Sequence, residues 1–446
     1  MTRRELLASM AAPLAAQPTA RKPNIVVLFA DDLGYGECGF QGNREIPTPN
    51  VDSIARAGVR FSNGYVTAPV CCPSRAGMIT GRYQTRFGHE FNLIGKANQG
   101  ANVGLPLSEK TIADHLKAAG YRTGLVGKWH LGGSPRYHPL RRGFEEFYGF
   151  LHEGHFYYPP PYRGGLTRLR TNEPPYDDEN PVLRDTKPIV EPEYLTDALA
   201  REGAAFIGRN KEKPFFLYLA FNAIHSPMQA PVPLVREFPH IVDEQRRLFA
   251  AMLTSMDNAV GRVIGALRDA GVENDTLLIF LSDNGGPTAE LTSNNQPLRG
   301  GKGQLWEGGI RIPFSMQWKG RIPGGVSYEE PVSSLDILPT ALAAAGAKAA
   351  PLDGVDLLPY LSQGRGGVPH DSLFWRYGRS MALRRGRWKI VRQPAGRNAP
   401  AQFALYDLAA DVAETRDLRE SAKPDFERLS REVEELNRQM APPLWN

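Results

Sequence analysis

Four groups of polar residues stand just after apolar runs, and their types are those that bind metals and anions. In chain order the groups are Asp31-Asp32, Lys128 with His130, His225, and Asp283-Asn284. Carboxylate and amide oxygens are the ligands that Ca²⁺ and Mg²⁺ prefer. Lysine and histidine beside such a metal suit an anion whose charge the metal also neutralises. One aspartate alone would pass as a helix cap, but four such groups together indicate a site.

The apolar runs that precede these groups predict strands of a mostly parallel sheet. Residues 24–30 form a largely apolar run, which is typical of a strand covered on both faces. Further strands are predicted at 122–127, 214–221 and 276–281, with helices at 48–58, 108–119, 196–209, 245–270 and 334–345. This alternation predicts an α/β fold, a large mostly parallel sheet flanked by helices. Because ligands bind beyond the carboxyl ends of such strands, the four polar groups should converge on one crevice.

The pattern changes after about Leu361, where short strands replace the alternation. Strands are predicted at 372–377, 380–383, 387–392 and 403–406, with a hairpin turn at Arg385-Gly386 and a helix at 424–440. These elements predict a small C-terminal antiparallel sheet with a packed helix. We therefore expect a main domain at 21–361 and a C-terminal α+β subdomain at 362–446.

Composition excludes several classes of protein. The 446 residues carry a net charge of +5 without a dense basic block, which gives no support to nucleic-acid binding. Three cysteines build no disulfide framework, and no apolar run is long enough to predict a membrane span. Residues 1–20 hold the pair Arg3-Arg4 before an Ala-rich run, similar to a bacterial twin-arginine export signal, which predicts a periplasmic or secreted protein. The alternative is a frayed N-terminus with two chance arginines.

The most specific signal is the stretch Val-Cys-Cys-Pro-Ser-Arg at 70–75, followed by Thr-Gly-Arg at 80–82. This pattern resembles the signature of the type I sulfatases, in which Cys71 would be oxidised to Cα-formylglycine. The other stretches that match the family are Asp31-Asp32-Leu-Gly-Tyr-Gly, Gly127-Lys128-Trp-His130, His225-Ser-Pro, Ser282-Asp283-Asn284-Gly, Gly301-Lys302-Gly and Glu307-Gly-Gly. The resemblance covers residues 22–408 approximately. It is to the arylsulfatase and N-acetylgalactosamine-sulfatase branch of the alkaline-phosphatase-like superfamily. It implies that 21–361 is the catalytic domain.

The resemblance also implies a role for each matched residue. The metal, Ca²⁺ or alternatively Mg²⁺, would be held by Asp31, Asp32, Asp283, Asn284 and the formylglycine at Cys71. Three aspartates so close together would repel one another and need a cation. The formylglycine is hydrated to a diol, of which one hydroxyl attacks sulfur and the second allows sulfate to leave.

The remaining matched residues imply binding and proton transfer. Arg75 and Lys128 would fix and polarise the diol, and His130 would be the base in sulfate release. His225 and Lys302 would lie nearest the leaving oxygen, and with Lys128 they would bind the substrate. We assign the general acid to His225 because imidazole titrates near neutral pH, although the opposite assignment of His225 and Lys302 stays open.

We therefore expect a sulfatase that hydrolyses the sulfate ester of a carbohydrate, or an aryl sulfate, after maturation by a formylglycine-generating enzyme. Two alternatives remain: a formylglycine-dependent phosphonate monoester or phosphodiester hydrolase, and a catalytically silent sulfoglycan-binding protein. Loop residues His152, His155, Tyr157 and Tyr158 either line the substrate pocket or cover the surface. The same two alternatives, lining the substrate pocket or covering the surface, apply to His89, Glu90 and Asn92. Cys38 and Cys72 are expected to be free thiols.

Overall fold

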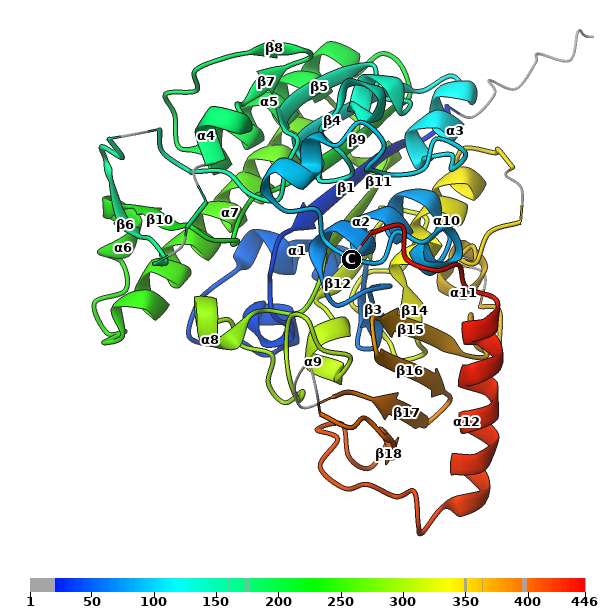
Figure 1. The fold of residues 1–446 in the computed structure, drawn as a ribbon. Helices are drawn as coiled ribbons and strands as arrows, with labels where there is room; N and C mark the ends of the chain where they lie inside the picture. Colours follow the sequence, from blue (N-terminus) through cyan, green and yellow to red (C-terminus); the bar gives the residue numbers. More distant parts are fainter. Residues whose placement is uncertain are drawn as a thin grey trace, which may run out of the picture.

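A ten-stranded sheet crosses the main part of the molecule (Figure 1). The structure, a computed structural model, describes residues 21–445 apart from 160, 172, 175, 349–350, 363 and 395–398. In spatial order the strands are β13 (Val326–Tyr328), β2 (Val59–Phe61), β12 (Phe314–Gln317), β11 (Thr276–Ser282), β1 (Asn24–Ala30), β9 (Phe215–Ala220), β4 (Arg122–Lys128), β5 (Glu146–Phe150), β7 (Leu183–Arg184) and β8 (Lys187–Pro188). The five strands from β11 to β5 run parallel.

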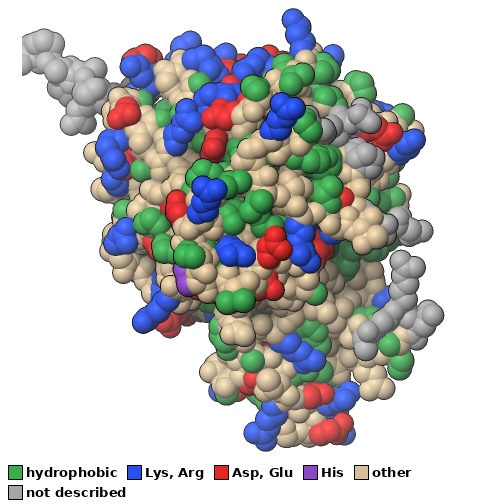
Figure 2. Space-filling view, turned by 90° about the vertical axis from the view of Figure 1, so that its left-hand side faces the viewer, with side chains coloured by type: hydrophobic (Ala, Val, Ile, Leu, Met, Phe, Trp, Pro, Cys, Tyr) green, Lys and Arg blue, Asp and Glu red, His purple; other side chains and the backbone are tan. Residues whose placement is uncertain are grey.

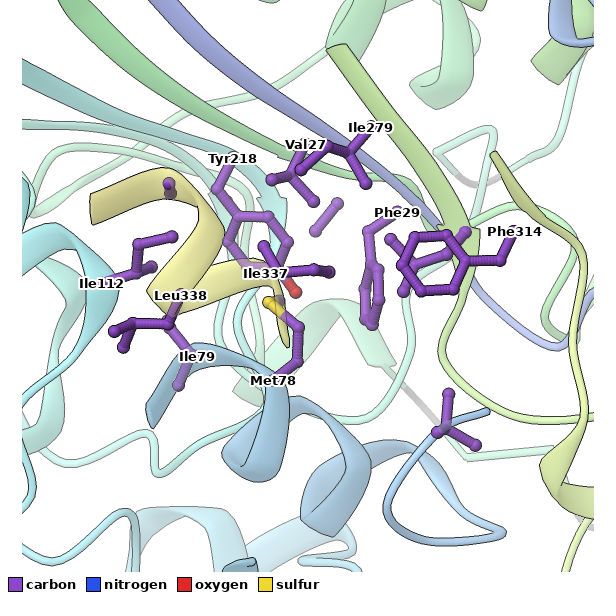
Figure 3. Close-up of a cluster of buried hydrophobic side chains, with 14 of the residues drawn as sticks. Val27, Phe29, Met78, Ile79, Ile112, Tyr218, Ile279, Phe314, Ile337 and Leu338 are labelled. Carbon is purple, nitrogen blue, oxygen red and sulfur yellow. The ribbon is translucent and has the colours of Figure 1, made fainter. Parts of the chain in front are cut away.

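Helices cover both faces of this sheet, and alternate residues of β1 pack into the two resulting cores. Val26 and Leu28 face one core, covered by α1 (Pro49–Ala57), α5 (Leu195–Asn210) and α7 (Glu244–Asp269). Val27 and Phe29 face the other, covered by α2 (Cys71–Thr80), α3 (Ile112–Ala118) and α10 (Ile337–Ala344). Figure 3 shows this second core, in which Met78 of α2 lies among side chains of the sheet and of α10. Burial on both faces explains why β1 is apolar from its second residue onward.

A second sheet of four antiparallel strands lies beside the main one, with one long helix against it (Figure 1). We call β15 (Leu373–Tyr377), β16 (Ser380–Arg385), β17 (Trp388–Arg392) and β18 (Phe403–Asp407) the C-terminal sheet. Helix α12 (Lys423–Arg438) packs on it through Leu429 and Val433. The shorter elements are β3 (Gly64–Tyr65), β6 (Gly165–Arg168), β10 (Met228–Pro231), β14 (Val332–Ser333), α4 (Tyr176–Glu179), α6 (Val232–Val235), α8 (Thr288–Leu291), α9 (Glu307–Ile310) and α11 (Leu358–Ser362).

The predicted fold class is confirmed, and the differences are local. The turn between β16 and β17 is Gly386-Arg387 rather than Arg385-Gly386, because Arg385 pairs with Trp388 and Gly386 adopts φ 57°. Short strands at or next to the edges of the sheet, such as β2, β7 and β13, are not predicted from the sequence, since two or three residues carry too little periodicity. The predicted export signal at 1–20 lies outside the described residues. None of the described helices is long and apolar enough to span a membrane. Figure 2 shows Lys and Arg interspersed with Asp and Glu over one face.

Candidate functional site

The carboxyl ends of four neighbouring parallel strands bring the predicted polar groups to one place. β1 lies between β11 and β9, and β4 lies beside β9. Ala30 pairs with Ser282, so Asp31 and Asp283 leave adjacent strands at the same level. The backbone N–H of Asp283 donates to the carbonyl of Ala30 at 3.1 Å, and that of Asp31 donates to Ala223 at 2.8 Å. These bonds extend the sheet past its strand ends and fix the polar side chains relative to one another.

Cys71 lies at the centre of this group, as the first residue of α2. Its buried Sγ lies 3.5 Å from Oδ1 of Asp31. The ligand atoms of Asp31, Asp32, Cys71 and Asp283 all lie within 4.8 Å of one another. Burial raises the pKa of the Cys71 thiol well above its usual value, so the unmodified thiol is a poor nucleophile. The helix N-terminus adds partial positive charge, which favours an anion here.

Each of the three aspartates contacts a cation of the chain. The distances are 2.5 Å for Lys128 and Asp31, 2.7 Å for Lys302 and Asp32, and 2.8 Å for Arg75 and Asp283. Burial is the largest single influence and raises the pKa of Asp32, but Lys302, His225 and the Asn284 hydrogen bond together outweigh burial and hold that pKa well below its usual value. Burial and then Asp31 raise the pKa of Asp283. The cations therefore offset only part of the repulsion expected among the carboxylates, because Asp31 still raises the pKa of Asp283, and a metal ion would relieve the repulsion that remains.

The donor atoms themselves fit a hard metal ion. Nδ2 of Asn284 donates to Oδ1 of Asp32 at 2.7 Å, and Oδ1 of Asn284 is buried without a hydrogen-bond partner among the described residues. A buried polar atom without a partner costs about 1–3 kcal/mol, and a metal ion would satisfy it. Asp32 has φ 64°, a conformation that is uncommon for residues with a Cβ and clusters at functional sites. Carboxylate oxygens together with this amide oxygen match the preference of Ca²⁺ or Mg²⁺.

His130 presents one ring nitrogen that is ready to accept a proton. Its Nε2 donates to the carbonyl of Leu93 at 2.8 Å, which leaves Nδ1 as the unprotonated nitrogen. Nδ1 is buried and has no hydrogen-bond partner in the described part of the chain. Burial and then the charge of Lys128 hold the pKa of His130 well below its usual value, so the ring is neutral. A neutral imidazole with an unengaged lone pair has the form that a base requires.

His225 differs from its prediction in one respect. Burial and then Lys302 and Lys128 lower its pKa to about 3, although imidazole ordinarily titrates near neutral pH. Nδ1 donates to the carbonyl of Ser226 at 2.6 Å, and Nε2 lies 3.8 Å from Asp32. Nε2 therefore donates only when the ring is an imidazolium, a form that a bound anion would favour. Burial lowers the pKa of Lys302, but Asp32 and the other acidic groups of the site together outweigh burial and raise it, so Lys302 stays charged.

Comparison with known proteins settles the family. The family model described as Sulfatase matches residues 23–347, more than half of the chain. The chain belongs to the sulfatase family. It is accordingly a sulfuric ester hydrolase, as the resemblance of the Cys71 stretch predicts.

Relatives of this sulfatase cover most of its length. It is 38% identical to arylsulfatase A of Homo sapiens over 395 residues, which are 83% of this chain and 73% of the relative. It is 35% identical to the N-acetylgalactosamine-6-sulfatase of Sus scrofa over 406 residues, which are 86% and 74% of the two chains. The solved structure of Ps i-CgsB matches with 37% identity and a TM-score of 0.87 over 95% of each chain. Ps i-CgsB has also been solved in complex with k-i-k-neocarrahexaose.

Glycines let the chain around Lys302 of this sulfatase approach the end of β11. A Cβ on Gly285, which follows the predicted metal ligands, would lie 1.8 Å from the carbonyl oxygen of Gly308. A Cβ on Gly309 would lie 2.0 Å from the carbonyl oxygen of Gln304. Only glycine permits such approaches, so these positions of the sequence pattern serve to bring Lys302 to the site.

The loop residues predicted to line the pocket lie in two cavities. His155 lines a cavity of about 340 Å³ with Phe156 and Tyr157, and His152 lines another of about 280 Å³. Neither lining includes Cys71, so contact of either histidine with substrate stays a prediction. Tyr157 contacts the carbonyl oxygen of His225 at 2.9 Å through its hydroxyl, and so supports the loop that holds this histidine.

The segment at 89–92 supports the Cys71 helix. Nε2 of His89 lies 2.9 Å from Sγ of Cys72, and Asn92 accepts from the Cys72 backbone N–H at 2.9 Å. Arg376 of β15 binds Glu90 at 2.6 Å. Cys38 and Cys72 are free thiols, as expected, and Cys71 forms no disulfide either.

Tyr377, at the end of β15, is a residue near the site that no sequence pattern indicated. Burial and then Cys71 raise its pKa, and Lys302 acts in the opposite direction. Its ring centroid lies 5.4 Å from that of Phe91. Cys71 influences the pKa of Tyr377 only because the C-terminal sheet packs beside the main one, and nothing local in the sequence predicts that packing.

Proposed function

We propose that Cys71 is converted to Cα-formylglycine and that the protein hydrolyses the sulfate ester of a carbohydrate at this position. The observation that carries the proposal is the convergence of four strand ends on Cys71. The pKa of the buried thiol is raised, so the unmodified side chain would be a weak nucleophile. The formylglycine would supply an oxygen nucleophile in its place.

We assign the metal to Asp31, Asp32, Asp283 and Asn284, with Ca²⁺ as the expected ion and Mg²⁺ as the alternative. The unpartnered Oδ1 of Asn284 and the three carboxylates support this donor set. When bound, the ion would neutralise charge on the sulfate group.

The remaining side chains would bind the sulfate ester and move protons. Arg75 and Lys128 both contact Asp31, whose carboxylate lies 3.5 Å from Cys71, and these cations would orient the nucleophile and the anion. His130 would accept a proton at Nδ1 during sulfate release. His225 as imidazolium, with Lys302 beside it, would protonate the leaving oxygen.

The proposal of a carbohydrate substrate rests on the relatives. Ps i-CgsB, similar over 95% of each chain, binds a neocarrahexaose, and an N-acetylgalactosamine-6-sulfatase is 35% identical. Export to the periplasm or beyond, through the predicted twin-arginine signal at 1–20, would bring the enzyme to sulfated polysaccharides. A formylglycine-generating enzyme would act before export, since that route carries folded proteins.

Two measurements test this function. Conversion of Cys71 removes about 18 Da from the tryptic peptide that ends at Arg75. Turnover is then compared across defined sulfated oligosaccharides, p-nitrophenyl sulfate, and phosphate mono- and diesters. We expect the mass change and a preference for sulfated oligosaccharides. A preference for phosphodiesters or phosphonates would overturn the sulfatase assignment, and oligosaccharide binding without hydrolysis of any ester would indicate a silent binding protein.

A further inference from the structure

The C-terminal sheet contacts the short stretch of chain that holds Lys302, which we call the Lys302 segment (residues 299–307). Nη1 of Arg299 donates to the carbonyl of Glu414 at 2.8 Å, and the backbone N–H of Leu305 donates to Oε1 of Gln393 at 2.8 Å. Gln393 directly follows β17, and Glu414 lies beyond β18. The segment is therefore held on both sides of Lys302 by residues about a hundred positions away in the sequence.

A buried ion cluster closes the far end of the segment. Nζ of Lys389, on β17, lies 2.9 Å from Glu307 and 2.8 Å from Glu414, and all three side chains are fully buried. The backbone N–H of Glu307 also donates to Glu414 at 2.7 Å. Removing one partner of such a cluster leaves a buried charge uncompensated, so these contacts fix the backbone of Glu307 strongly.

The other contacts of the segment lead to the site. The backbone N–H of Gly303 donates to the carbonyl of Pro69 at 2.8 Å, two residues before Cys71. The N–H of Lys302 lies 3.4 Å from the carbonyl of Gly286, and its Nζ reaches Asp32 at 2.7 Å. The segment thus joins the C-terminal sheet to the nucleophile helix and to the end of β11.

We infer that Lys389, Glu414 and Gln393 are positioning residues for Lys302, so that the C-terminal sheet is a working part of the catalytic site. This inference rests on the proposed role of Lys302 at the leaving oxygen. A flexible lysine placed on a glycine-rich loop needs external support to hold its ammonium in one position. Displacement of about 1 Å at such a group can cost up to about a hundredfold in rate.

The test compares Gln393→Ala with Gln402→Ala, a matched change in the same sheet. The Gln402 side chain accepts from Arg419 rather than from the Lys302 segment. Lys389→Met is a second variant with a larger expected effect, because it removes the cation of the buried cluster. If Lys389→Met fails to fold, Gln393→Ala still decides the test. Each variant is made alone and combined with Lys302→Ala, and the formylglycine content and bound calcium of each are measured.

We expect Gln393→Ala and Lys389→Met to lower kcat on a sulfated oligosaccharide roughly tenfold to a hundredfold, with unchanged formylglycine and calcium. Gln402→Ala should match wild type. In the Lys302→Ala background the same changes should have little further effect, because residues that act through one group are not additive. Equal losses in both backgrounds, or no loss in either variant while Lys302→Ala is impaired, would overturn the inference. Wild-type turnover by Lys302→Ala would instead overturn the proposed role of Lys302, and the inference with it.

Discussion

The ammonium of Lys302 lies 2.7 Å from the carboxylate of Asp32, although 270 residues separate the two in sequence. This contact joins the side chain that we propose acts at the leaving oxygen to a side chain that we propose binds the metal. Asp32 is almost fully buried, and Lys302 is 18% exposed, so the pair is shielded from solvent. A change at either residue should therefore affect both metal binding and proton transfer.

Removal of the metal should abolish turnover and lower the melting temperature moderately. The three carboxylates keep their lysine and arginine partners without the ion, so the fold should survive. Saturation at about 100 times Kd stabilises a protein by about 2.7 kcal/mol, and this contribution is what chelation would remove. Activity and melting temperature are measured after exhaustive chelation and after adding back Ca²⁺ or Mg²⁺. Full activity in a sample that contains no metal by elemental analysis would contradict the assignment.

His225→Ala should impair the hydrolysis of sulfates with poor leaving groups more than that of activated aryl sulfates. General acid catalysis contributes about 10²–10⁴-fold, and a phenol of low pKa needs less of it. The measurement is kcat/KM on a sulfated oligosaccharide and on p-nitrophenyl sulfate. Equal losses of kcat/KM on both substrates would show that another group protonates the leaving oxygen, and Lys302 would be the first candidate.

His130→Ala should fail at a later step, because we propose that Nδ1 of His130, which has no hydrogen-bond partner among the described residues, accepts the proton that accompanies sulfate release. We expect enzyme carrying sulfate at position 71 to accumulate, visible as an intact mass about 80 Da above that of the hydrated formylglycine form, which is about 98 Da above the aldehyde form. A variant that loses turnover without any accumulation would place His130 in an earlier step.

Cys71→Ser should turn over at most once, whereas Cys72→Ala should mature and turn over normally. A serine sulfate ester lacks the second hydroxyl that would expel sulfate, so the variant stays esterified. Cys72 contacts His89 and not the carboxylates, and Cys38→Ala provides a second control at a buried free thiol. Repeated turnover by Cys71→Ser, with no aldehyde detected by mass, would show that the diol is not needed.

Stability should fall as the pH rises above about 6.5, through the pair of His370 and Asp336. Nε2 of His370 lies 2.8 Å from Asp336, and although burial lowers the pKa of His370, Asp336 outweighs burial and raises it. A histidine whose pKa is raised in the folded state stabilises below its unfolded pKa, and loses this contribution as pH rises through the folded value. Melting temperatures from pH 6 to 9 should show this decline in wild type and less of it in His370→Gln. The exposed His240→Gln serves as control and should keep the wild-type slope.

The sequence alone determined the chemistry of the site and the elements that present it. Asp31 and Asp283 directly follow buried strands and Lys128 is the last residue of another, and residues at the carboxyl ends of parallel strands must meet at one edge of the sheet. The stretch around Cys71 was enough to indicate the sulfatase family, because the motif is long and its residues are adjacent in the sequence. Strand and helix positions followed from apolar runs and glycine stops, whereas edge strands of two or three residues were too short for periodicity to show.

Only the tertiary structure decided how these groups act on one another. The pairing of each aspartate with a cation, the low pKa of His225 and the unengaged Nδ1 of His130 depend on burial and on distances between residues far apart in sequence. The contacts between the C-terminal sheet and the Lys302 segment also depend on the tertiary structure, since no sequence motif around Gln393 or Glu414 predicts them. Local sequence specifies which side chain follows a strand, but electrostatic effects depend on the separation of charges in space, and packing between distant elements sets that separation.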